Sequence, residues 1–598
     1  MIFISILILI VAIALPTINK NLSAILYTRI SSIIFIYAGA LSLNALHIQS
    51  IGSGIGIYSG LFHVTLISQS LEVFLLIIGS IILLSWPLYI NKNNFNRMKD
   101  ISFLKNTVNL PKDEEEIFNL DENEVLDKTD CRTEYSLIVL FSTLGSSLLI
   151  SSSDLISMYL SIELQSFGLY ILATLYRDLE SATSAGLKYF LIGGLSSCLI
   201  LFGSGLLYSF TGLTNFESVY SLISVSDNNY IIQGLSLGLI FIIVGFLIKI
   251  ASAPLHNWAP DVYDDSPTIV TIWLTIMPKL SILILLLELQ TQIDIIGELS
   301  SSSFKLNLEN LVNINLILGE NTKYVLKNLL LISSLLSLII GTVVGLSQTR
   351  VKRLLAYSTI SHIGFILLAL VINTEQSIDS LLFYIIQYTI TNLNTFLILI
   401  ALGYSIDYTT NKYNLLNNKV YNQLGKGELN KDIKFISELK SQFYSNPVLS
   451  LSLTVCLFSM AGVPPLIGFF SKQFVLYSAI QNGYNFMSVL AILASVISAS
   501  YYLKIIRLLH TEVEEDSFNN NLMLNFLSKS EEVKWYKIKD SLVKNKNQFG
   551  GSYESYKALT NFHSFLISSL TLTIILFVFK PSIILNITQL LSLSIYNF

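Results

Sequence analysis

The sequence predicts an all-α membrane protein with roughly fourteen transmembrane helices, ten of them forming two inverted five-helix repeats. Three observations lead to this class. Of the 598 residues, 52% are hydrophobic and only 13% are charged, and the mean hydropathy is +0.63. The apolar runs are about 20 residues long, which suits helices that span a membrane and not strands. Two of the runs are interrupted by prolines at corresponding places in two halves of the chain.

Apolar runs recur along the whole chain. Lys and Arg gather in the odd-numbered connections, which places those connections on the inner side of the membrane and both termini outside. The seventh connection is an exception, because Asp261, Asp264 and Asp265 make it acidic. The predicted spans are 2–18, 29–48, 65–90, 134–152, 154–175, 186–210, 231–258, 267–289, 327–348, 353–373, 378–405, 447–479, 486–509 and 563–595.

These spans divide the chain into repeats and polar insertions. We expect a solvated loop, and not a docking segment, at the acidic run Asp113–Asp127. The predicted units are three N-terminal helices plus a polar loop (1–133), a first repeat of spans four to eight (134–290), a polar loop (291–326), a second repeat of spans nine to thirteen (327–509) with an inserted loop (406–446), and a polar loop with the last helix (510–598).

The composition also argues against several functions. A net charge of −4 gives no sign of nucleic-acid binding. Cys131, Cys198 and Cys456 lie far apart, so no zinc or iron–sulfur motif is predicted. The glycine-rich run at 52–60 lacks the dinucleotide-binding register. We therefore expect no metal or cofactor site in this chain.

The first apolar run indicates a membrane span and not a removable signal. It begins without a positive region and has no clear small-residue cleavage site, and no Arg-rich transit segment is present. Ile, Leu, Asn, Tyr, Phe and Lys are abundant while Ala is scarce, as in proteins from AT-rich genomes. We therefore expect synthesis inside the organelle where the protein works.

Span seven combines a charge with helix-breaking residues. A lysine near the bilayer centre costs about 2.5 to 3.5 kcal/mol and survives where it faces protein, water or a counter-charge. Pro254 and Pro260 leave backbone carbonyls unpaired, which is tolerated at this depth only beside protein or a wet cavity. We therefore predict that Lys249 lies on a broken helix that lines a water-filled cavity, and that its side chain does not extend to the membrane–water interface. Lys279 follows on the next span, beside Pro278.

Span twelve repeats this pattern in the second half. Pro464 and Pro465 lie eight and seven residues before Lys472. Interrupted hydrophobic segments at corresponding positions of two halves indicate inverted repeats around a transport path. Spans seven and twelve are each the fourth of five, so both are predicted to be broken helices.

Span five carries a single carboxylate. Glu163 lies on a polar stripe with intervals of three or four residues, which indicates a lined interior. Lys188, at the start of span six, is a candidate partner, because a carboxylate beside an ammonium keeps both charged and separation favours the neutral forms. The alternative for Lys188 is an end-of-helix lysine that reaches the interface. His256 and His362 each suit a proton relay or a cap for loose backbone, and the sequence leaves both roles open.

Over about 134–509 the sequence combines several features. They are one glutamate in the fifth span, lysines in the seventh and eighth, and broken seventh and twelfth helices. In this combination the chain resembles the antiporter-like membrane subunits of respiratory complex I and their relatives, the multisubunit sodium/proton antiporters. Three stretches carry the resemblance most clearly. They are LKYFLIGGLSSCLILFGSGLLYSFTG, WAPDVYDDSPTIVT and MAGVPPLIGFFSKQFVL. The chain departs from its relatives in the long polar insertions and in Asp265, where a small residue is common.

The resemblance implies residue roles and a setting. Glu163 and Lys249 would form the first-half pair, Lys279 the central relay, Lys472 the second-half protonatable site, and Lys188 a further lysine on span six. The implied location is the mitochondrial inner membrane, in a row with sister antiporter-like subunits, accessory subunits and lipids. NADH, FMN, iron–sulfur clusters and ubiquinone are then expected in partner subunits.

The resulting hypothesis is proton translocation along these buried Glu and Lys residues and water, driven by quinone reduction elsewhere in an NADH:ubiquinone oxidoreductase. Lysine suits this task because its pKa shifts readily on burial, whereas arginine stays charged. Two alternatives stay open at this point. One is a cation/proton antiporter without redox chemistry, and the other is a structural subunit that holds a complex together.

Overall fold

Helices make up nearly all of the regular structure in the computed structural model. It describes residues 1–15, 24–48, 54–85, 134–177, 179–225, 229–304, 315–416, 432–511 and 561–596. The elements are α1 (Ile2–Ala14), α3 (Ala24–Ala45), β1 (Ile55–Ile57), β2 (Phe62–Val64), α4 (Leu66–Leu84), α8 (Glu134–Ile150), α9 (Leu155–Thr174), α10 (Glu180–Thr211), α11 (Phe216–Val225), α12 (Asn229–Ile250), α13 (Trp258–Asp265), α14 (Thr268–Phe304), α15 (Asn315–Leu346), α16 (Val351–Ile372), α17 (Glu375–Leu416), η3 (Ile436–Leu439), α18 (Gln442–Ser445), α19 (Pro447–Ala461), α20 (Ile467–Gln481), α21 (Asn485–His510), α24 (Asn561–Leu576), η4 (Phe577–Phe579) and α25 (Ser582–Tyr596).

Many of these helices have the length and composition of membrane spans. In the described part of the chain, 10 helices are long and apolar enough to cross a membrane, and shorter apolar helices lie at 2–14, 134–150, 234–250, 447–461 and 582–595. Helices suit this environment because they satisfy their backbone hydrogen bonds within one segment. The prediction of a helical multi-pass membrane protein is confirmed, whereas the number fourteen stays a prediction.

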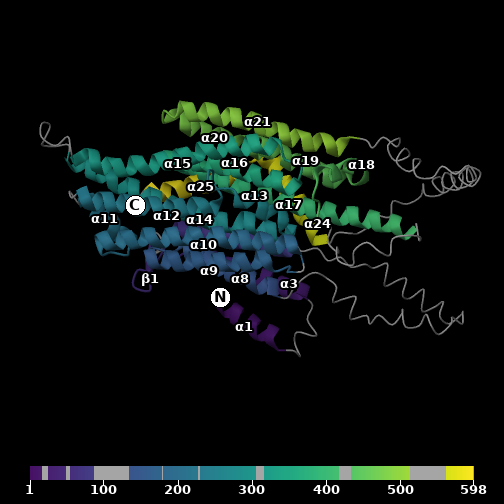
Figure 1. Ribbon diagram of the computed structural model, residues 1–598, viewed down its shortest axis with the longest axis horizontal. Helices are drawn as coiled ribbons and strands as arrows, with labels where there is room; N and C mark the ends of the chain where they lie inside the picture. The colour runs from purple at the N-terminus through teal and green to yellow at the C-terminus, as the bar shows by residue number, and fades with distance from the viewer. Residues whose placement is uncertain are drawn as a thin grey trace, which may run out of the picture.

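The long helices run roughly parallel to one another (Figure 1). One group consists of α8, α9, α10 and α12, and a second consists of α15, α16, α17, α19, α20 and α21. Helix α14 joins the two groups, because it contacts α8 and α12 of the first and α16 and α17 of the second. The apolar part of α14 is almost entirely buried, so this helix forms the centre of the molecule.

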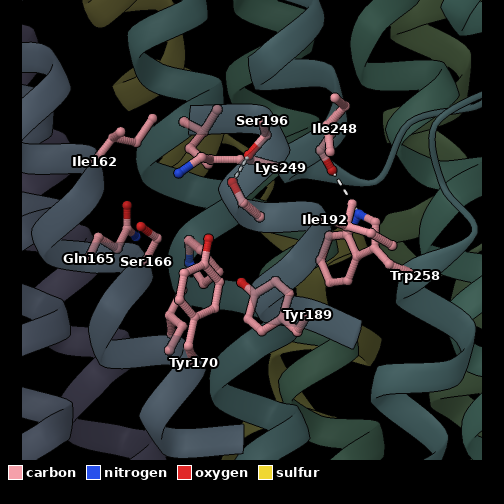
Figure 2. A pocket seen from close by; sticks show the side chains of 14 residues that line it. Ile162, Gln165, Ser166, Tyr170, Tyr189, Ile192, Ser196, Ile248, Lys249 and Trp258 are labelled. Atoms are coloured by element: carbon pink, nitrogen blue, oxygen red, sulfur yellow. Dashed lines mark hydrogen bonds between the residues drawn. The ribbon is translucent and has the colours of Figure 1, made fainter. Parts of the chain in front are cut away.

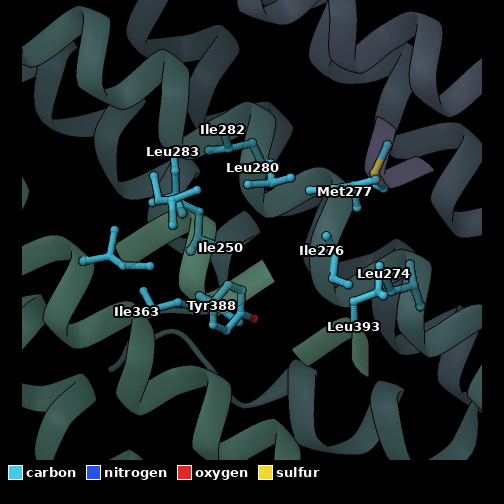
Figure 3. Close-up of a cluster of buried hydrophobic side chains, with 14 of the residues drawn as sticks. Ile250, Leu274, Ile276, Met277, Leu280, Ile282, Leu283, Ile363, Tyr388 and Leu393 are labelled. Atoms are coloured by element: carbon cyan, nitrogen blue, oxygen red, sulfur yellow. The ribbon is translucent and has the colours of Figure 1, made fainter. Parts of the chain in front are cut away.

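The core is densest around α14 (Figure 3). Leu280 and Leu283 of α14 are buried together with Ile250 of α12, Ile363 of α16 and Tyr388 of α17. Lipid tails are as apolar as leucine, so van der Waals packing of such side chains, and not the hydrophobic effect, holds helices together inside a membrane. The two groups of helices are therefore joined by close packing over α14.

Glycines permit the close contact between α10 and α12. A Cβ atom on Gly203 would lie 2.6 Å from the carbonyl oxygen of Gly238, whereas a Cβ on Gly205, on the same helix, would meet nothing within 4 Å. Gly203→Ala is therefore expected to destabilise the subunit by about 1–3 kcal/mol through overpacking, while Gly205→Ala has no such cost. Thermal unfolding of the assembled protein checks this difference. An equal loss of stability in both variants would contradict the packing.

Two predicted segments differ from the structure. Helix α14 continues to Phe304 and α15 begins at Asn315, where the sequence predicted a polar loop over 291–326. Polar composition marks where a helix leaves apolar surroundings and not where it ends, and this stretch contains no proline. The single last span at 563–595 is two helices, α24 and α25, separated at Pro581. The acidic run 113–127 lies outside the described residues.

The glycine-rich run near residue 55 forms a β-hairpin of the antiparallel strands β1 and β2. Gly54 and Gly60 have φ angles of 80° and 86°, which glycine adopts without steric cost. The hairpin is fixed to the turn between α8 and α9, since the backbone N–H of His63 donates to the carbonyl of Ser151 at 2.8 Å.

One backbone connection occurs in both groups of helices. In each, residues at the start of one helix form two hydrogen bonds with residues of the connection that follows the next long helix. These bonds join Leu155 N to Thr214 O (2.9 Å) and Phe216 N to Ser153 O (3.0 Å) in the first group, and Val351 N to Lys434 O and Ile436 N to Thr349 O (both 3.0 Å) in the second.

Candidate functional site

Helices α12 and α13 form the predicted broken helix. The break contains Pro254, whereas Pro260 lies in the first turn of α13 and does not interrupt it, because the first turn needs no backbone donor. The break leaves carbonyls at the end of α12 without helical partners, and neighbouring groups supply them. Ser252 donates to the carbonyl of Leu247 from its backbone N–H (3.0 Å) and its hydroxyl (3.1 Å). The indole Nε1–H of Trp258 donates to the carbonyl of Ile248 at 2.8 Å. The broken backbone is therefore satisfied at depth.

Lys249 lies in the last turn of α12 and pairs with Glu163 of α9. Its Nζ is 3.7 Å from Glu163 Oε1, and the two side chains are only 8% and 15% exposed. This separation is too long for a direct hydrogen bond. Neither atom has a hydrogen-bond partner among the described residues. The C-terminal carbonyls of α12 favour the ammonium at this end of the helix.

A cavity of about 20 Å³ opens beside Lys249 (Figure 2). A site of roughly 10–15 Å³ suffices for one water when polar partners surround it. Lys249 reaches toward Gln165 and Ser166 of α9, and Tyr189 and Trp258 form the opposite wall (Figure 2). The wall is completed by Ile162, Leu169, Tyr170, Ile192, Gly193, Ser196, Ile248, Pro278 and Ile282.

Lys188 does not pair with Glu163, and this prediction was wrong. Its Nζ donates to Asp261 Oδ2 of α13 at 3.1 Å, and its side chain is 49% exposed. Periodicity placed Lys188 at the start of a span but could not show which way the side chain leaves the helix. The partner of Glu163 is Lys249, as the family resemblance implied.

Lys279 lies at the centre of the molecule on α14. It is 2% exposed, and it donates to the hydroxyl of Thr359 on α16 at 3.1 Å. Its Nζ also lies 5.3 Å from the centre of the Tyr263 ring, which attracts a cation electrostatically. Among the described residues, no carboxylate forms an ion pair with Lys279. A neutral hydroxyl and an aromatic ring are therefore the partners that stabilise the Lys279 ammonium among the described residues.

The second broken helix consists of α19 and α20, and Lys472 lies in the second turn of α20, just after the break. Its Nζ donates to the carbonyls of Met460 and Ala461, both at 2.9 Å, at the C-terminus of α19. A helix C-terminus favours a cation. Gly462 has a φ of 85°, and a Cβ there would come within 3.0 Å of Lys472 Cδ. The break at Pro464 and Pro465 thus creates the binding place for the ammonium.

The two histidines take different positions. His256 Nδ1 lies 3.2 Å from the carbonyl oxygen of Pro254, so this side chain is placed to cap the break. His362 is buried on α16 between two tyrosines, with Nδ1 at 2.7 Å from the hydroxyl of Tyr384 and Nε2 at 3.5 Å from that of Tyr502. Of the two roles left open by the sequence, His256 has the geometry of the cap and His362 that of a side-chain relay.

Sequence reasoning missed the polar side chains of α17, which packs on both α14 and α20. Ser471, next to Lys472, donates to Gln387 Oε1 at 3.4 Å. The hydroxyl of Tyr388 donates to the carbonyl of Thr275 at 3.4 Å and accepts from Asn392 at 3.2 Å. The signal was the polar run QYTITNLNT in an otherwise apolar span.

The acidic seventh connection faces the basic ninth connection. Arg350 Nη1 lies 2.7 Å from Asp264 Oδ2, and Arg353 Nη2 lies 2.6 Å from Asp261 Oδ1. The carboxylates that made the seventh connection an exception to the Lys and Arg distribution are thus partly neutralised by arginines on the same side of the protein. Both odd-numbered connections share one side, as predicted from the Lys and Arg distribution.

Within the described residues, no cluster of three or more His, Cys, Asp or Glu side chains could hold a metal ion. Cys198 is exposed, and the buried Cys456 accepts a hydrogen bond from Asn394 at 3.1 Å.

Two broken helices and a buried row of lysines in a helical multi-pass fold define an antiporter-like membrane subunit. The chain belongs to the NADH:quinone oxidoreductase/Mrp antiporter transmembrane family, whose model matches residues 152–304 and 299–498. It is 45% identical to NADH-ubiquinone oxidoreductase chain 2 of Rhizopus oryzae over 599 residues, covering 100% of both chains. It is 37% identical to NADH-quinone oxidoreductase subunit N of a Brugia malayi Wolbachia over 381 residues, covering 64% of this chain and 70% of the relative.

Solved structures show the same fold. Respiratory complex I from Thermus thermophilus contains a chain that superposes with a TM-score of 0.59 at 22% identity, covering 97% of this chain and 98% of that one. The resemblance to the antiporter-like complex I subunits, and to subunit 2 among them, is therefore confirmed.

Proposed function

We propose that the chain is a membrane subunit of a proton-translocating NADH:ubiquinone oxidoreductase and moves protons through its buried Glu and Lys side chains and water. Family membership supports this function, as does the 45% identity to a fungal NADH-ubiquinone oxidoreductase chain 2 over the full length. The chain takes part in the enzyme reaction as a translocating subunit. NADH, FMN, the iron–sulfur clusters and ubiquinone belong to partner subunits.

The pair of Glu163 and Lys249 beside the water-sized cavity is the observation that carries the proposal. At 3.7 Å the two charges attract each other without a direct hydrogen bond, and the cavity against Lys249 leaves room for a water that bonds with its ammonium. When Lys249 is neutral, Glu163 loses its counter-charge. The protonation of one group therefore changes the proton affinity of the other.

The remaining lysines extend the route through the molecule. Lys188 and Asp261 lie at the surface, at one end of the route, and Lys279 lies at the centre of the molecule. From Lys279 the side chains of α17 lead toward Lys472, which is 7% exposed. His362 is a candidate relay beside them. Lys279 and Lys472 are held by neutral partners, so loss of a proton from either leaves no unpaired carboxylate in direct contact.

Two inverted five-helix repeats account for this arrangement, within a fold of fourteen spans. The repeated backbone connection supports them, since it joins the fourth connection to the sixth in the first half and the ninth to the eleventh in the second. Even and odd connections lie on opposite sides of the membrane, so the same pattern occurs in inverted orientation. The unit boundaries at 134–290 and 327–509 follow from these repeats.

The setting follows from the relatives. We place the protein in the mitochondrial inner membrane, encoded in the organelle, because the fungal relative that matches along its whole length is an NADH-ubiquinone oxidoreductase chain. Sister antiporter-like subunits, accessory subunits and lipids then cover its sides. Apolar residues such as Leu191, Leu195 and Phe202 of α10 are exposed and suit these neighbours.

Lys472→Met in the intact complex tests the route. We expect a severalfold drop in protons pumped per NADH oxidised by sealed vesicles, because methionine fills the space but carries no proton. Lys504→Met is the matched control, since Lys504 is exposed on α21. Unchanged pumping in an assembled Lys472→Met complex would contradict the route, and dependence of transport on sodium would favour the antiporter alternative.

A further inference from the structure

Asp432 lies in the connection between α17 and α19, which was predicted as an inserted polar loop. Its segment is fixed to the protein on one side by the backbone hydrogen bonds around Thr349 and Val351, just before α16. On the other side, the carboxylate reaches the first residue of α14. The connection therefore touches the N-termini of two central helices.

The carboxylate of Asp432 accepts three hydrogen bonds. Thr268 donates from its backbone N–H (2.9 Å) and its hydroxyl (2.8 Å), and Lys352 Nζ donates at 2.6 Å. Lys352 also donates to the carbonyl of Ser266 at 2.9 Å. Thr268 begins α14, so Asp432 caps this helix and places a negative charge at its positive end.

Asp432 and Lys352 form a close ion pair. The Lys352 side chain is 4% exposed, so its ammonium depends on Asp432 for charge compensation. Burial alone would raise the pKa of the Asp432 carboxyl, but the charge of Lys352 and the hydrogen bonds from Lys352 and Thr268 outweigh burial and hold the pKa below its ordinary value. The carboxylate is thus ionised at neutral pH.

The same two helices carry the central contact of the site. Lys279 lies three turns after Thr268 on α14, and Thr359 lies two turns after Lys352 on α16. Lys279 donates to Thr359 at 3.1 Å. Helices α14 and α16 are therefore joined at two places, by Asp432 at their N-termini and by the Lys279–Thr359 hydrogen bond further along. Sliding one helix along the other would strain both contacts.

We propose that Asp432 is a positioning residue for Lys279: it fixes α14 against α16 and so keeps the Lys279 ammonium on the Thr359 hydroxyl. This inference rests on the proposed role of Lys279 in proton transfer. It assigns a function in the transport reaction to the described part of this insertion, residues 432–446.

The test compares Asp432→Asn and Asp432→Glu in the intact complex, with Glu438→Gln as the matched control. Glu438 lies in the same segment and accepts hydrogen bonds only from the backbone of Lys434 and Phe435 among the described residues. We expect Asp432→Asn to lower the protons pumped per NADH severalfold, Asp432→Glu to recover part of this loss, and Glu438→Gln to have no effect.

Thr359→Val provides a second readout, which a purely structural role of Asp432 would not change. If Asp432 acts through the Lys279–Thr359 contact, the combined variant Asp432→Asn/Thr359→Val loses no more pumping than the worse single variant. Multiplied losses overturn the inference, as does normal pumping by an assembled Asp432→Asn complex. If Asp432→Asn fails to assemble, Asp432→Asn/Lys352→Met removes the buried charge as well, and normal pumping by that complex also overturns it.

Lys279→Met separates this inference from the function on which it rests. Normal pumping in Lys279→Met means that the proposed route is wrong, whatever Asp432 does. Loss of pumping in Lys279→Met together with normal pumping in Asp432→Asn means that the route holds and only the positioning role fails.

Discussion

Replacing Lys279 with methionine is expected to stop proton transfer between the two halves of the protein while the complex stays assembled. Methionine fills the buried space, and no carboxylate in the described structure is left without a partner, so the fold should tolerate the change. We expect at least about a tenfold loss of pumping, because a positioned proton-transfer group typically contributes 10²- to 10⁴-fold. Proton uptake by sealed vesicles during NADH oxidation measures the effect.

Lys279→Arg sharpens this prediction. Arginine keeps the positive charge but does not release its proton, so this variant should also fail to pump. Lys440→Met serves as the control, since Lys440 is exposed. Normal pumping in Lys279→Arg would mean that only a fixed charge is needed at the centre, and the relay role would have to be abandoned.

Glu163→Gln is expected to impair both pumping and stability. The change leaves the buried ammonium of Lys249 without its counter-charge, and breaking a buried pair in this way costs roughly 3–5 kcal/mol. The double variant Glu163→Gln/Lys249→Met removes both charges, so we expect it to recover assembly but not pumping. Quantifying the assembled complex and its proton-to-NADH ratio separates the two effects. Recovery of pumping in the double variant would show that the pair is structural.

Much of the fold followed from local patterns. Proline pairs in apolar runs located both helix breaks, at Pro254 and at Pro464, because a missing backbone donor acts where it occurs in the chain. Intramembrane charge located Lys249, Lys279 and Lys472, since each is too costly to bury without a reason. Such signals are local and strong, and they do not depend on knowing the neighbouring helices.

Side-chain partners were harder to predict. Lys188 was paired with Glu163 by proximity in sequence, but the side chain leaves α10 toward Asp261. Asp432 gave no signal at all, because a carboxylate in a polar connection resembles any solvated loop residue until its segment is seen to fold onto α14 and α16. These contacts depend on how distant helices meet, which periodicity does not encode.

The measurement that tests the central claim most directly is the number of protons pumped per NADH oxidised by vesicles carrying the intact complex, with Lys249→Met compared against the unmodified protein and assembly verified. The buried Glu163–Lys249 pair, with a cavity against Lys249, predicts that the ratio falls while the complex stays assembled. An unchanged ratio would contradict the account, because these charges would then be structural and the subunit a scaffold.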